Sequence, residues 1–567
     1  MTKEETSTEV SLLVTRPNKV FSAEYFTDEI KTARYFLADS SLGARWLAGD
    51  ARFGVEVGAE VDADHLAQLF EGRDRSGNSL LLQNAGMKRR ISAYELSVGV
   101  SKSVSAVWAL AAPEGRAAIE RTFAKSLDPI VDHIQRNAFT RLGHNGKVVI
   151  AAQPNICAFI QPDTRPVLQS DGIVAIQPQL HAHIVLPNLV AIQPDELSLG
   201  GKDKDVKLQP LDREIPLRFL TRSLDGQPIF RGAKSWGALQ HLALATELQR
   251  HGYAIGDIGR NGTFEIVPPT DEREADRKLR AFWSQRRAEI ECELSDLGLT
   301  TADSPELAAR AAVKTRRAKL TASSKDTFAR WREEAEALGI DTERYSENRR
   351  GIELELPGLR DSEIAIRMAD VPERLTEFES TFDHHDLVRE VASALVGTGV
   401  EVSRVDDEIV GLLDSGAIVE IGRTDRERIF STPEMIRLER EIIDISTRLA
   451  DQPWHRIDRN NLAQHCQAAG LSDEQTAAAL GIADGRSIDF IEARSGTGKT
   501  FTLVPVCRSL EDDYRIIATG VSWRTARMLE DELSGPDRNL RVEARALDSW
   551  LAVSRRPLLR FPHSSVG

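Results

Sequence analysis

The stretch QPQLHAHIVLPNL, residues 177–189, places two histidines two positions apart in an otherwise apolar run, although the chain has only 12 histidines among 567 residues. Side chains alternate between the two faces of a β-strand, so His181 and His183 would share one face, about 7 Å apart at ~3.3 Å per residue. Two imidazoles placed in this way can each give one nitrogen to a single metal ion. An isolated H-x-H is more often a pair of ordinary half-buried histidines, so the rest of the chain must decide between the two interpretations.

The composition is that of an ordinary globular protein, with 41% hydrophobic and 28% charged residues. No apolar run reaches 18 residues, the first 20 residues lack the pattern of a secretory signal, and the four cysteines are widely scattered. These features predict a cytoplasmic, multidomain protein with free thiols and no membrane segment. The net charge of −14 neither indicates nor excludes a nucleic-acid partner, because local basic clusters such as MKRR at 87–90 can still contact phosphates.

Changes in sequence texture predict four regions. Residues 1–235 combine a helical pattern at 24–38 with three strand-like runs, at 89–100, 146–161 and 172–190, and with one long helix between the first two runs. This order predicts an antiparallel sheet with helices against one face.

The remaining regions predict an α/β multidomain chain. Residues 236–375 have the charged, helix-period texture of a helical linker that clamps DNA, and 376–465 predict a winged-helix-like connector with two helices and a hairpin. Residues 466–567 return to an α/β rhythm, which predicts part of a RecA-like P-loop domain.

The sequence ARSGTGKT at 493–500 is close to the phosphate-binding pattern G-x-x-x-x-G-K-[ST], with alanine in place of the first glycine. A strand is predicted before it, at 487–493, and a helix after it. Gly496 and Gly498 would let backbone N–H groups surround phosphate oxygens, Lys499 would neutralise the β- and γ-phosphates, and Thr500 would hold Mg²⁺. The pattern therefore predicts ATP binding.

Gln475 in LSDEQ lies upstream of this loop, where many DNA helicases use a glutamine to read adenine; surface polarity is an equally good explanation. After residues 518–533 we find no acidic Walker B strand and no second motor domain. Because a helicase needs both, helicase activity is not expected of this chain.

Phosphoryl transfer beside a bound metal requires a nucleophile. The chain has six tyrosines, and two of them, Tyr25 in AEYF and Tyr35 in ARYF, lie in similar dipeptides near the start. Attack of a tyrosine on a phosphodiester retains the bond energy in a phosphotyrosine, so the strand can later be rejoined. Packing in a core is the alternative role for each tyrosine.

Together these motifs resemble a known family. The tyrosine pair, ELSVGVSKSVS at 95–105, PQLHAH at 178–183 and a C-terminal P-loop occur in the order found in conjugative relaxases of the MobF class, the TrwC/TraI-like relaxase–helicases with an HUH fold. Residues 95–105 loosely match the family motif D-L-T-F-S-x-P-K-S-V-S, and the two-histidine motif is the most specific part of the resemblance.

The resemblance implies site- and strand-specific nicking of a single-stranded origin of transfer, with a 5′-phosphotyrosine as intermediate. Tyr25 would be the first nucleophile and Tyr35 the second, and His181 and His183 would bind a divalent metal, Mg²⁺ or Mn²⁺. Relaxosome accessory proteins and conjugative coupling proteins are the implied partners.

Two positions depart from the family pattern. The carboxylate that orients a histidine is usually aspartate but is Glu95 here, and the position expected to hold a third histidine ligand is Gln161. A glutamine oxygen suits Mg²⁺ or Mn²⁺ better than it suits softer metals. Two alternatives remain: a DNA-binding homologue that has lost catalysis, and a fragment of an ATP-dependent DNA helicase.

Overall fold

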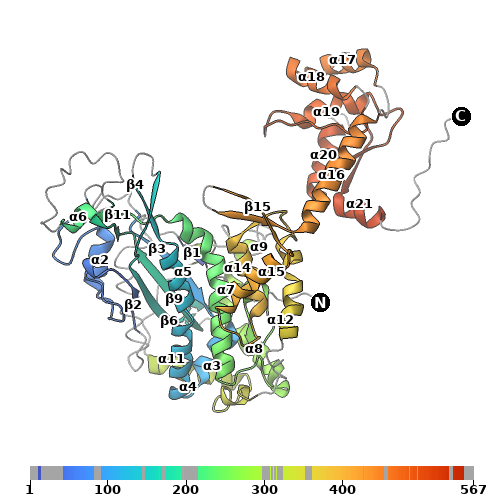
Figure 1. Cartoon of the computed structure of the whole chain (residues 1–567). Coiled ribbons are helices and arrows are strands. Elements are labelled where there is room, and N and C mark those ends of the chain that lie inside the picture. Colours follow the sequence, from blue (N-terminus) through green and yellow to red (C-terminus); the bar gives the residue numbers. More distant parts are fainter. Residues whose placement is uncertain are drawn as a thin grey trace. The chain divides into compact units, whose positions relative to one another are not determined.

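The computed structural model divides the chain into two compact units, Met1–Pro433 and Glu434–Gly567, which are considered separately below (Figure 1). Tyr25, Tyr35 and the helical pattern predicted at 24–38 lie outside the described residues. The described residues are 11–13, 43–81, 91–142, 147–164, 166–168, 174–194, 196, 215–295, 307, 311, 314–315, 324–351, 361–424, 427–452, 457–483, 486–494, 496–534 and 540–554.

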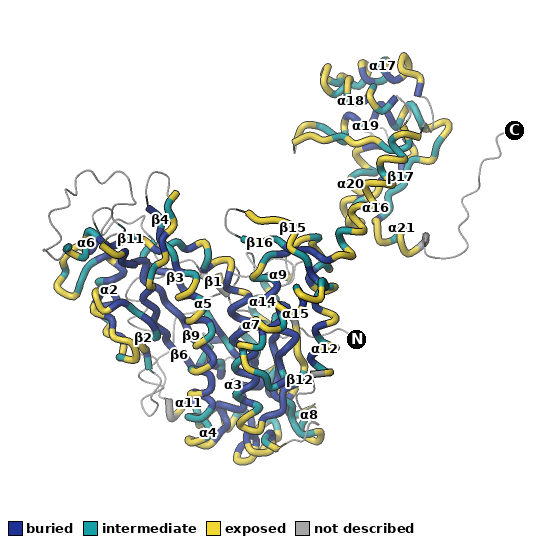
Figure 2. Tube along the Cα trace, viewed as in Figure 1, coloured by how far each residue is buried: buried dark blue, intermediate teal, exposed yellow. Residues whose placement is uncertain are grey.

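The first unit is built around a five-stranded antiparallel sheet, so the predicted sheet architecture is confirmed. The strand with the two histidines, β9, lies in its centre. The strands, in the order in which they pair, are β1 (Ser11–Leu13), β3 (Ala93–Gly99), β9 (Pro178–Pro187), β6 (Ile156–Asp163) and β2 (Arg45–Ala48). Figure 2 shows β3, β9 and β6 buried along most of their length.

Helices cover one face of this sheet, and alternate residues of β9 pack against them. Ala182 and Ile184 share a hydrophobic core with residues of these helices, and both are fully buried. The helices concerned are α3 (Lys102–Leu110), α4 (Pro113–Lys125), α5 (Asp128–Arg136) and α7 (Gln227–Arg250).

The single long helix predicted between the first two strand runs is wrong, because α3, α4 and α5 replace it. Pro113 occupies the first turn of α4 and Pro129 the first turn of α5. Proline has no N–H to donate and clashes with the preceding turn, so it is tolerated at a helix start and not in an interior. Each proline therefore marks the beginning of a new helix.

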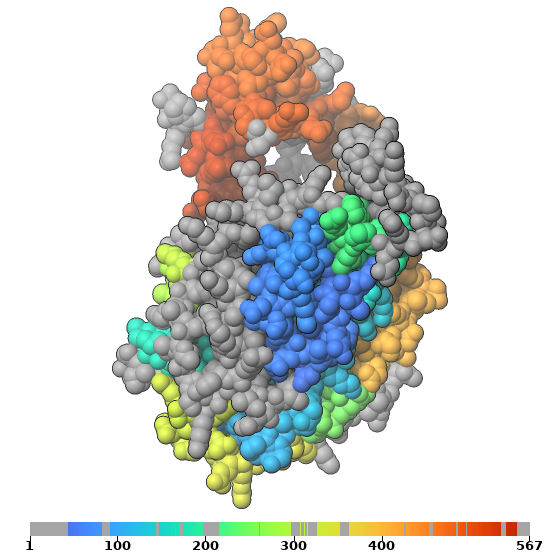
Figure 3. Space-filling model, turned by 90° about the vertical axis from the view of Figure 1, so that its left-hand side faces the viewer, coloured from blue at the N-terminus to red at the C-terminus, as the bar shows by residue number. Residues whose placement is uncertain are grey.

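The opposite face of the sheet is covered by a smaller layer. Trp46 of β2 and Phe159 of β6 pack there with Leu66 of α2 (Ala63–Glu71) and Leu220 of α6 (Leu217–Leu220). Figure 3 shows the surface of β2 and α2, in blue, beside α6, in green. The histidines of β9 point to this second face.

Two of the predicted strand runs are interrupted in the structure. The run at 146–161 contains β5 (Val148–Ala151), which pairs with β4 (Phe139–Leu142) in a separate hairpin, and then β6. The run at 172–190 contains the short strands β8 (Val174–Ala175) and β10 (Val190–Ala191) on either side of β9; they pair with β7 (Val167–Leu168) and β11 (Thr221–Arg222).

The charged helical region packs into the same core as the sheet. It contains β12 (Ile255–Gly256), β13 (Glu265–Ile266), α8 (Arg273–Phe282), α9 (Gln285–Ser295) and α11 (Ser324–Ala337). Trp331 of α11 is fully buried, and its ring lies 6.0 Å from that of Trp108 in α3. Because α7 also runs without a break through the predicted boundary at 235, the described helical region is continuous with the sheet domain.

The two helices and the hairpin predicted within 376–465 are present. The order is β14 (Phe382–Asp383), α14 (His384–Leu395), α15 (Arg404–Asp414), β15 (Val419–Arg423) and β16 (Arg428–Ser431), preceded by α12 (Asp361–Ala369) and α13 (Val371–Leu375). The strands form an antiparallel sheet in the order β14-β16-β15. This element order is that of a winged helix, although the division of the chain into four domains stays a prediction.

The second unit contains a parallel strand pair joined through a helix. Its elements are α16 (Pro433–Asp451), α17 (Arg459–Ala468), α18 (Asp473–Ile482), α19 (Lys499–Arg508), β17 (Ile516–Gly520), α20 (Trp523–Ser534), β18 (Val542–Ala546) and α21 (Leu547–Ser554). The strand predicted at 487–493 is wrong: these residues pair with neither β17 nor β18, and Phe490 is 78% exposed. Without a pairing partner an apolar run gains no strand hydrogen bonds. None of the described helices is both long and apolar enough to cross a lipid bilayer.

Candidate functional site

Three strands bring the predicted metal ligands and Glu95 to one face of the central sheet. Gly99 of β3 and Gln161 of β6 lie directly opposite His181 of β9. Two residues further along β9, His183 lies opposite Ser97 of β3 on one side and Phe159 of β6 on the other. Because opposite residues of antiparallel strands point to the same side, Gln161 and both histidines share a face.

The two imidazole rings are close neighbours, as the alternation of the strand predicts. Their centroids are 5.1 Å apart and their planes meet at 74°. His183 is 9% exposed, whereas His181 is half-buried. The pair therefore lies at the edge of the core, where one ring meets solvent more than the other.

Glu95 orients the buried histidine. Its Oε1 lies 2.5 Å from Nδ1 of His183, and its side chain is 1% exposed. In the sheet Glu95 lies opposite Val185, so it reaches His183 as a diagonal neighbour on the same face. The carboxylate accepts a hydrogen bond from Nδ1–H, so the proton stays on Nδ1 and the ring lone pair is on Nε2.

His181 has the same arrangement with a backbone partner. Its Nδ1 lies 2.9 Å from the carbonyl oxygen of Gln179, so Nδ1 donates there and Nε2 again carries the lone pair. Histidine ligands of metals are typically fixed in this way through their second nitrogen. Sequence reasoning missed this partner, because a backbone carbonyl has no signature in the amino-acid sequence.

Gln161 completes a set of donors that fits a divalent cation. It is 4% exposed, and within the described part of the chain its Nε2 has no hydrogen-bond partner, nor does Oε2 of Glu95. A cation would bind this amide through its oxygen, Oε1, because Nε2 carries only donor hydrogens. No group of three His, Cys, Asp or Glu residues suited to a metal occurs among the described residues, so two histidines and an amide are the donors available here.

The four tyrosines outside the predicted pair differ in their surroundings. Tyr94 donates to the carbonyl of Leu224 at 3.4 Å, and Tyr345 donates to Asp276 at 2.6 Å. Burial raises the pKa of both hydroxyls, and most strongly that of Tyr345. Tyr253 is also in the core, at 2% exposed, whereas Tyr514 is half-buried in the second unit. The described tyrosines of the first unit are therefore core residues and poor nucleophiles.

The loop around Lys499 has the conformation of a helix-capping glycine turn. Gly498 caps α19 with a φ of +81°, and Gly496 has a φ of +79°. Nζ of Lys499 donates to the carbonyl oxygens of Ala493 and Arg494, at 2.7 and 3.0 Å, so the loop closes around its own lysine. Thr500 lies in the first turn of α19. The helix predicted after the motif is present, whereas the strand predicted before it is not.

Gln475 contacts this loop directly. Its Oε1 accepts from the backbone N–H of Ser472 at 3.1 Å in a capping box at the start of α18, and its Nε2 donates to the carbonyl of Thr497 at 3.1 Å. The amide thus ties α18 to the loop. The spacing S-x-x-Q in Ser472–Gln475 was the available signal for this structural role, while the reading of adenine stays a prediction.

Several known proteins are similar to this chain. It is 24% identical over 540 residues to the multifunctional conjugation protein TraI of Escherichia coli (strain K12), a match covering 91% of this chain and 27% of that protein. A second Escherichia coli TraI is 23% identical over 432 residues, covering 74% of this chain and 21% of that protein. The chain therefore spans about a quarter of the length of these relatives.

Solved structures of conjugative relaxase TrwC in complex with oriT DNA are also similar. A copper-bound form has a TM-score of 0.44 at 21% identity, and a metal-bound form has 0.43 at 22%; each covers 59% of this chain and 99% of the solved one. Scores this low add nothing to the assignment of a family. The family model described as TrwC relaxase, however, matches residues 21–338, more than half of the chain, and the chain therefore belongs to the TrwC relaxase family, the MobF-type relaxases that its motifs predict.

Proposed function

We propose that this protein is a conjugative relaxase that cuts single-stranded DNA at an origin of transfer by tyrosine transesterification. The observation that carries the proposal is the arrangement of His181, His183 and Gln161 on one buried sheet face, with both histidines held through Nδ1. Membership of the TrwC relaxase family supports it. The two TrwC structures named above contain oriT DNA and a metal, and we propose the same classes of substrate and cofactor for this chain.

In the proposed reaction, Tyr25 is the nucleophile. Its hydroxyl oxygen forms a bond to the scissile phosphorus, the 3′ oxygen leaves and takes up a proton, and the 5′ phosphate remains on the tyrosine. Tyr35 serves for a second transesterification of the same kind. The burial of three other tyrosines leaves few alternatives in the first unit, which supports this choice.

His181, His183 and Gln161 would hold a divalent cation, Mg²⁺ or Mn²⁺. Such an ion, when bound, polarises a phosphate and stabilises charge on its oxygens. Glu95 keeps His183 in the tautomer that presents Nε2, and the carbonyl of Gln179 does the same for His181. An amide oxygen in place of a third imidazole makes the donor set harder, which favours Mg²⁺ or Mn²⁺ over softer metals.

The second unit is proposed to bind ATP through Gly496, Gly498, Lys499 and Thr500. The capping turn at the start of α19 supports this, because N–H groups at a helix N-terminus favour phosphate and a lysine adds positive charge. Lys499 must first leave the two loop carbonyls that it contacts. Accessory proteins at the origin of transfer and a conjugative coupling protein are the proposed partners.

The proposal is tested by trapping the covalent intermediate. The full chain is incubated with Mg²⁺ or Mn²⁺ and with labelled single-stranded oligonucleotides tiled across the DNA that flanks its gene, and the products are separated on a denaturing gel. A labelled band that survives SDS and is lost in Tyr25→Phe is the expected result. Tyr514→Phe, in the second unit, is the matched control and should retain the band.

Binding of an oligonucleotide without covalent capture under any divalent metal would contradict the proposed activity. The protein would then be a DNA-binding homologue without catalysis. A band that persists in Tyr25→Phe and disappears in Tyr35→Phe would instead move the first step to Tyr35.

A further inference from the structure

The carbonyl that contacts His181 belongs to a peptide group that is fixed from its other side. This group joins Gln179 to Leu180: its oxygen lies 2.9 Å from Nδ1 of His181, and its N–H donates to Oγ of Ser105 at 3.1 Å. A peptide group is planar, and its N–H and C=O point in opposite directions. Holding the N–H on Ser105 therefore aims the C=O at the His181 ring.

The preceding peptide group is fixed by the same helix. Nζ of Lys102 donates to the carbonyl oxygen of Pro178 at 2.9 Å, and the side chain of Gln179 donates to the carbonyl of Val100 at 2.8 Å. Lys102 and Ser105 are three residues apart in the first turns of α3, so both lie on the side of the helix that meets β9. Two consecutive peptide groups before His181 are thus attached to α3 and to the turn that leads into it.

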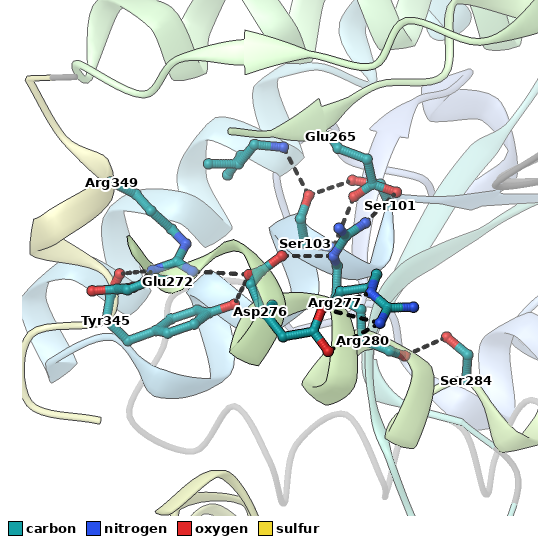
Figure 4. A network of polar contacts seen from close by, with 12 residues as sticks. Ser101, Ser103, Glu265, Glu272, Asp276, Arg277, Arg280, Ser284, Tyr345 and Arg349 are labelled. Atoms are coloured by element: carbon teal, nitrogen blue, oxygen red, sulfur yellow. Dashed lines mark hydrogen bonds and ion pairs between the residues drawn. The ribbon is translucent and has the colours of Figure 1, made fainter. Parts of the chain in front are cut away.

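The other side of this helix end is anchored in a buried ionic network (Figure 4). The backbone N–H of Ser103 donates to Glu265 at 3.2 Å, and Oγ of Ser103 accepts from the N–H of Ile266 at 2.8 Å. Glu265 lies 3.7 Å from Arg280, which binds Asp276 at 2.8 Å. The N-terminal turn of α3 is consequently held between β9 and the helical region.

Asp276 is the centre of this network. It also accepts from Tyr345 at 2.6 Å and from Arg349 at 2.8 Å, and neither Asp276 nor Arg349 is exposed to solvent. Buried ion pairs such as these resist displacement, because separating the partners leaves an unpaired charge in the interior. The network therefore gives α3 a rigid support against which Lys102 and Ser105 can hold β9.

We infer that Ser105 and Lys102 are positioning residues that set the orientation and tautomer of His181 through the peptide groups of Pro178 and Gln179. The inference rests on the proposed function, in which His181 is a metal ligand. The polar residues of the SKSVS segment at 101–105 then have two different roles. Lys102 and Ser105 hold β9, whereas Ser101 and Ser103 face the ionic network. Neither positioning residue touches the metal or the DNA in this scheme.

The direct test is a metal-free NMR measurement of the His181 ring. In protein labelled with ¹⁵N-histidine, the His181 signals are assigned with His181→Gln and should show Nδ1 protonated and Nε2 unprotonated. Ser105→Ala and Lys102→Met are expected to shift these signals towards a mixture of tautomers. Lys102→Arg, which can still donate to the Pro178 carbonyl, is expected to restore the wild-type pattern.

Mn²⁺ binding provides the second readout. Loss of a group hydrogen-bonded to a metal-binding histidine costs about 10–100-fold in affinity, and these residues act one step further away, so we expect Mn²⁺ to bind about tenfold more weakly in either variant. Electron spin echo spectra of bound Mn²⁺ should also show altered coupling to imidazole nitrogen. Ser126→Ala is the matched control, because Ser126 is another fully buried serine of the first unit and bonds to Phe123 and Gln240 instead.

The two readouts separate this inference from the proposed function. If Ser105→Ala and Lys102→Met leave the His181 tautomer as it is in the wild type, or change it no more than Ser126→Ala does, the inference is overturned even if DNA is cleaved. If the tautomer changes as expected but the wild type forms no covalent DNA adduct, the positioning role stands and the proposed cleavage fails.

Discussion

Exchange of Glu95 for aspartate, the residue usual in the family motif, should impair this protein. Glu95 reaches Nδ1 of His183 at 2.5 Å from a diagonal position in the sheet. Removing one methylene withdraws the carboxylate by about 1.5 Å, one C–C bond length. The resulting separation of about 4 Å exceeds the limit of about 3.2 Å for a hydrogen bond to nitrogen.

The magnitude follows from the two effects of this shortening. Loss of a hydrogen bond to a charged group costs about 1.5–3 kcal/mol, and a missing buried methylene adds about 0.5–1.5 kcal/mol. Glu95→Asp should therefore lower the free energy of unfolding of the first unit by about 2–4 kcal/mol. Glu95→Gln keeps the reach and an oxygen that accepts from Nδ1–H but loses the charge, so about 1 kcal/mol is expected.

Denaturant titrations followed by tryptophan fluorescence measure the free energy of unfolding of each protein. We expect it to fall in the order wild type, Glu95→Gln, Glu95→Asp. Titration calorimetry with Mn²⁺ should give the same order of affinities, with the aspartate variant weakest. Glu95→Asp that is as stable as Glu95→Gln, or that binds Mn²⁺ more tightly, would refute the reasoning, because the length of the side chain would then not decide the contact.

Three further outcomes are expected. Burial lowers the pKa of Lys102 to about 7, below the ~10.4 of an unfolded lysine. Below pH 7 the folded state therefore holds a buried charge, which lowers the free energy of unfolding. This destabilisation disappears as the pH rises towards 10, because the folded state then holds a neutral amine. Lys102→Met should thus raise the free energy of unfolding by about 3 kcal/mol at pH 6 and by much less at pH 10, and a gain independent of pH would count against this cause. Arg349→Met leaves Asp276 without one of its buried partners and should lower the free energy of unfolding by about 3 kcal/mol, measured by denaturant titration. A decrease below about 1 kcal/mol would show that the network does not support the fold. Gly498→Ala should destabilise the second unit by about 1 kcal/mol more than Gly496→Ala. Both glycines have positive φ, but only the Cβ at 498 would lie 2.8 Å from Nε2 of Gln475, which would have to move and lose its hydrogen bond to the Thr497 carbonyl. Equal losses on thermal unfolding would show that this hydrogen bond is not lost.

Period-two alternation predicted the histidine strand well, because a central strand with one face in the core leaves little freedom in its register. The shared face of His181 and His183 followed from it directly. The contact between Glu95 and His183 was expected only from the family resemblance, since the two residues are 88 positions apart and the sequence does not reveal how their strands pair.

The errors have local causes that can be named. Pro113 and Pro129 divided a helical pattern whose apolar spacing continued across them. Residues 487–493 are apolar enough for a strand but have no partner among the described strands, and pairing depends on residues far away in the chain. The roles of Ser105 and Lys102 were invisible for a third reason: their partners are backbone groups, which every residue carries.

The strand order of the central sheet has a consequence for how the protein folds. In the order β1-β3-β9-β6-β2, the only neighbours that follow one another among the five strands along the chain are β6 and β9. The other three pairings join strands that are distant along the chain, and non-local pairings of this kind slow folding because a long loop must close before any contact forms. β9 lies between β3 and β6, so Glu95, Gln161 and the two histidines come together only when β9 has paired with both of these neighbours, and neither pairing alone assembles the site.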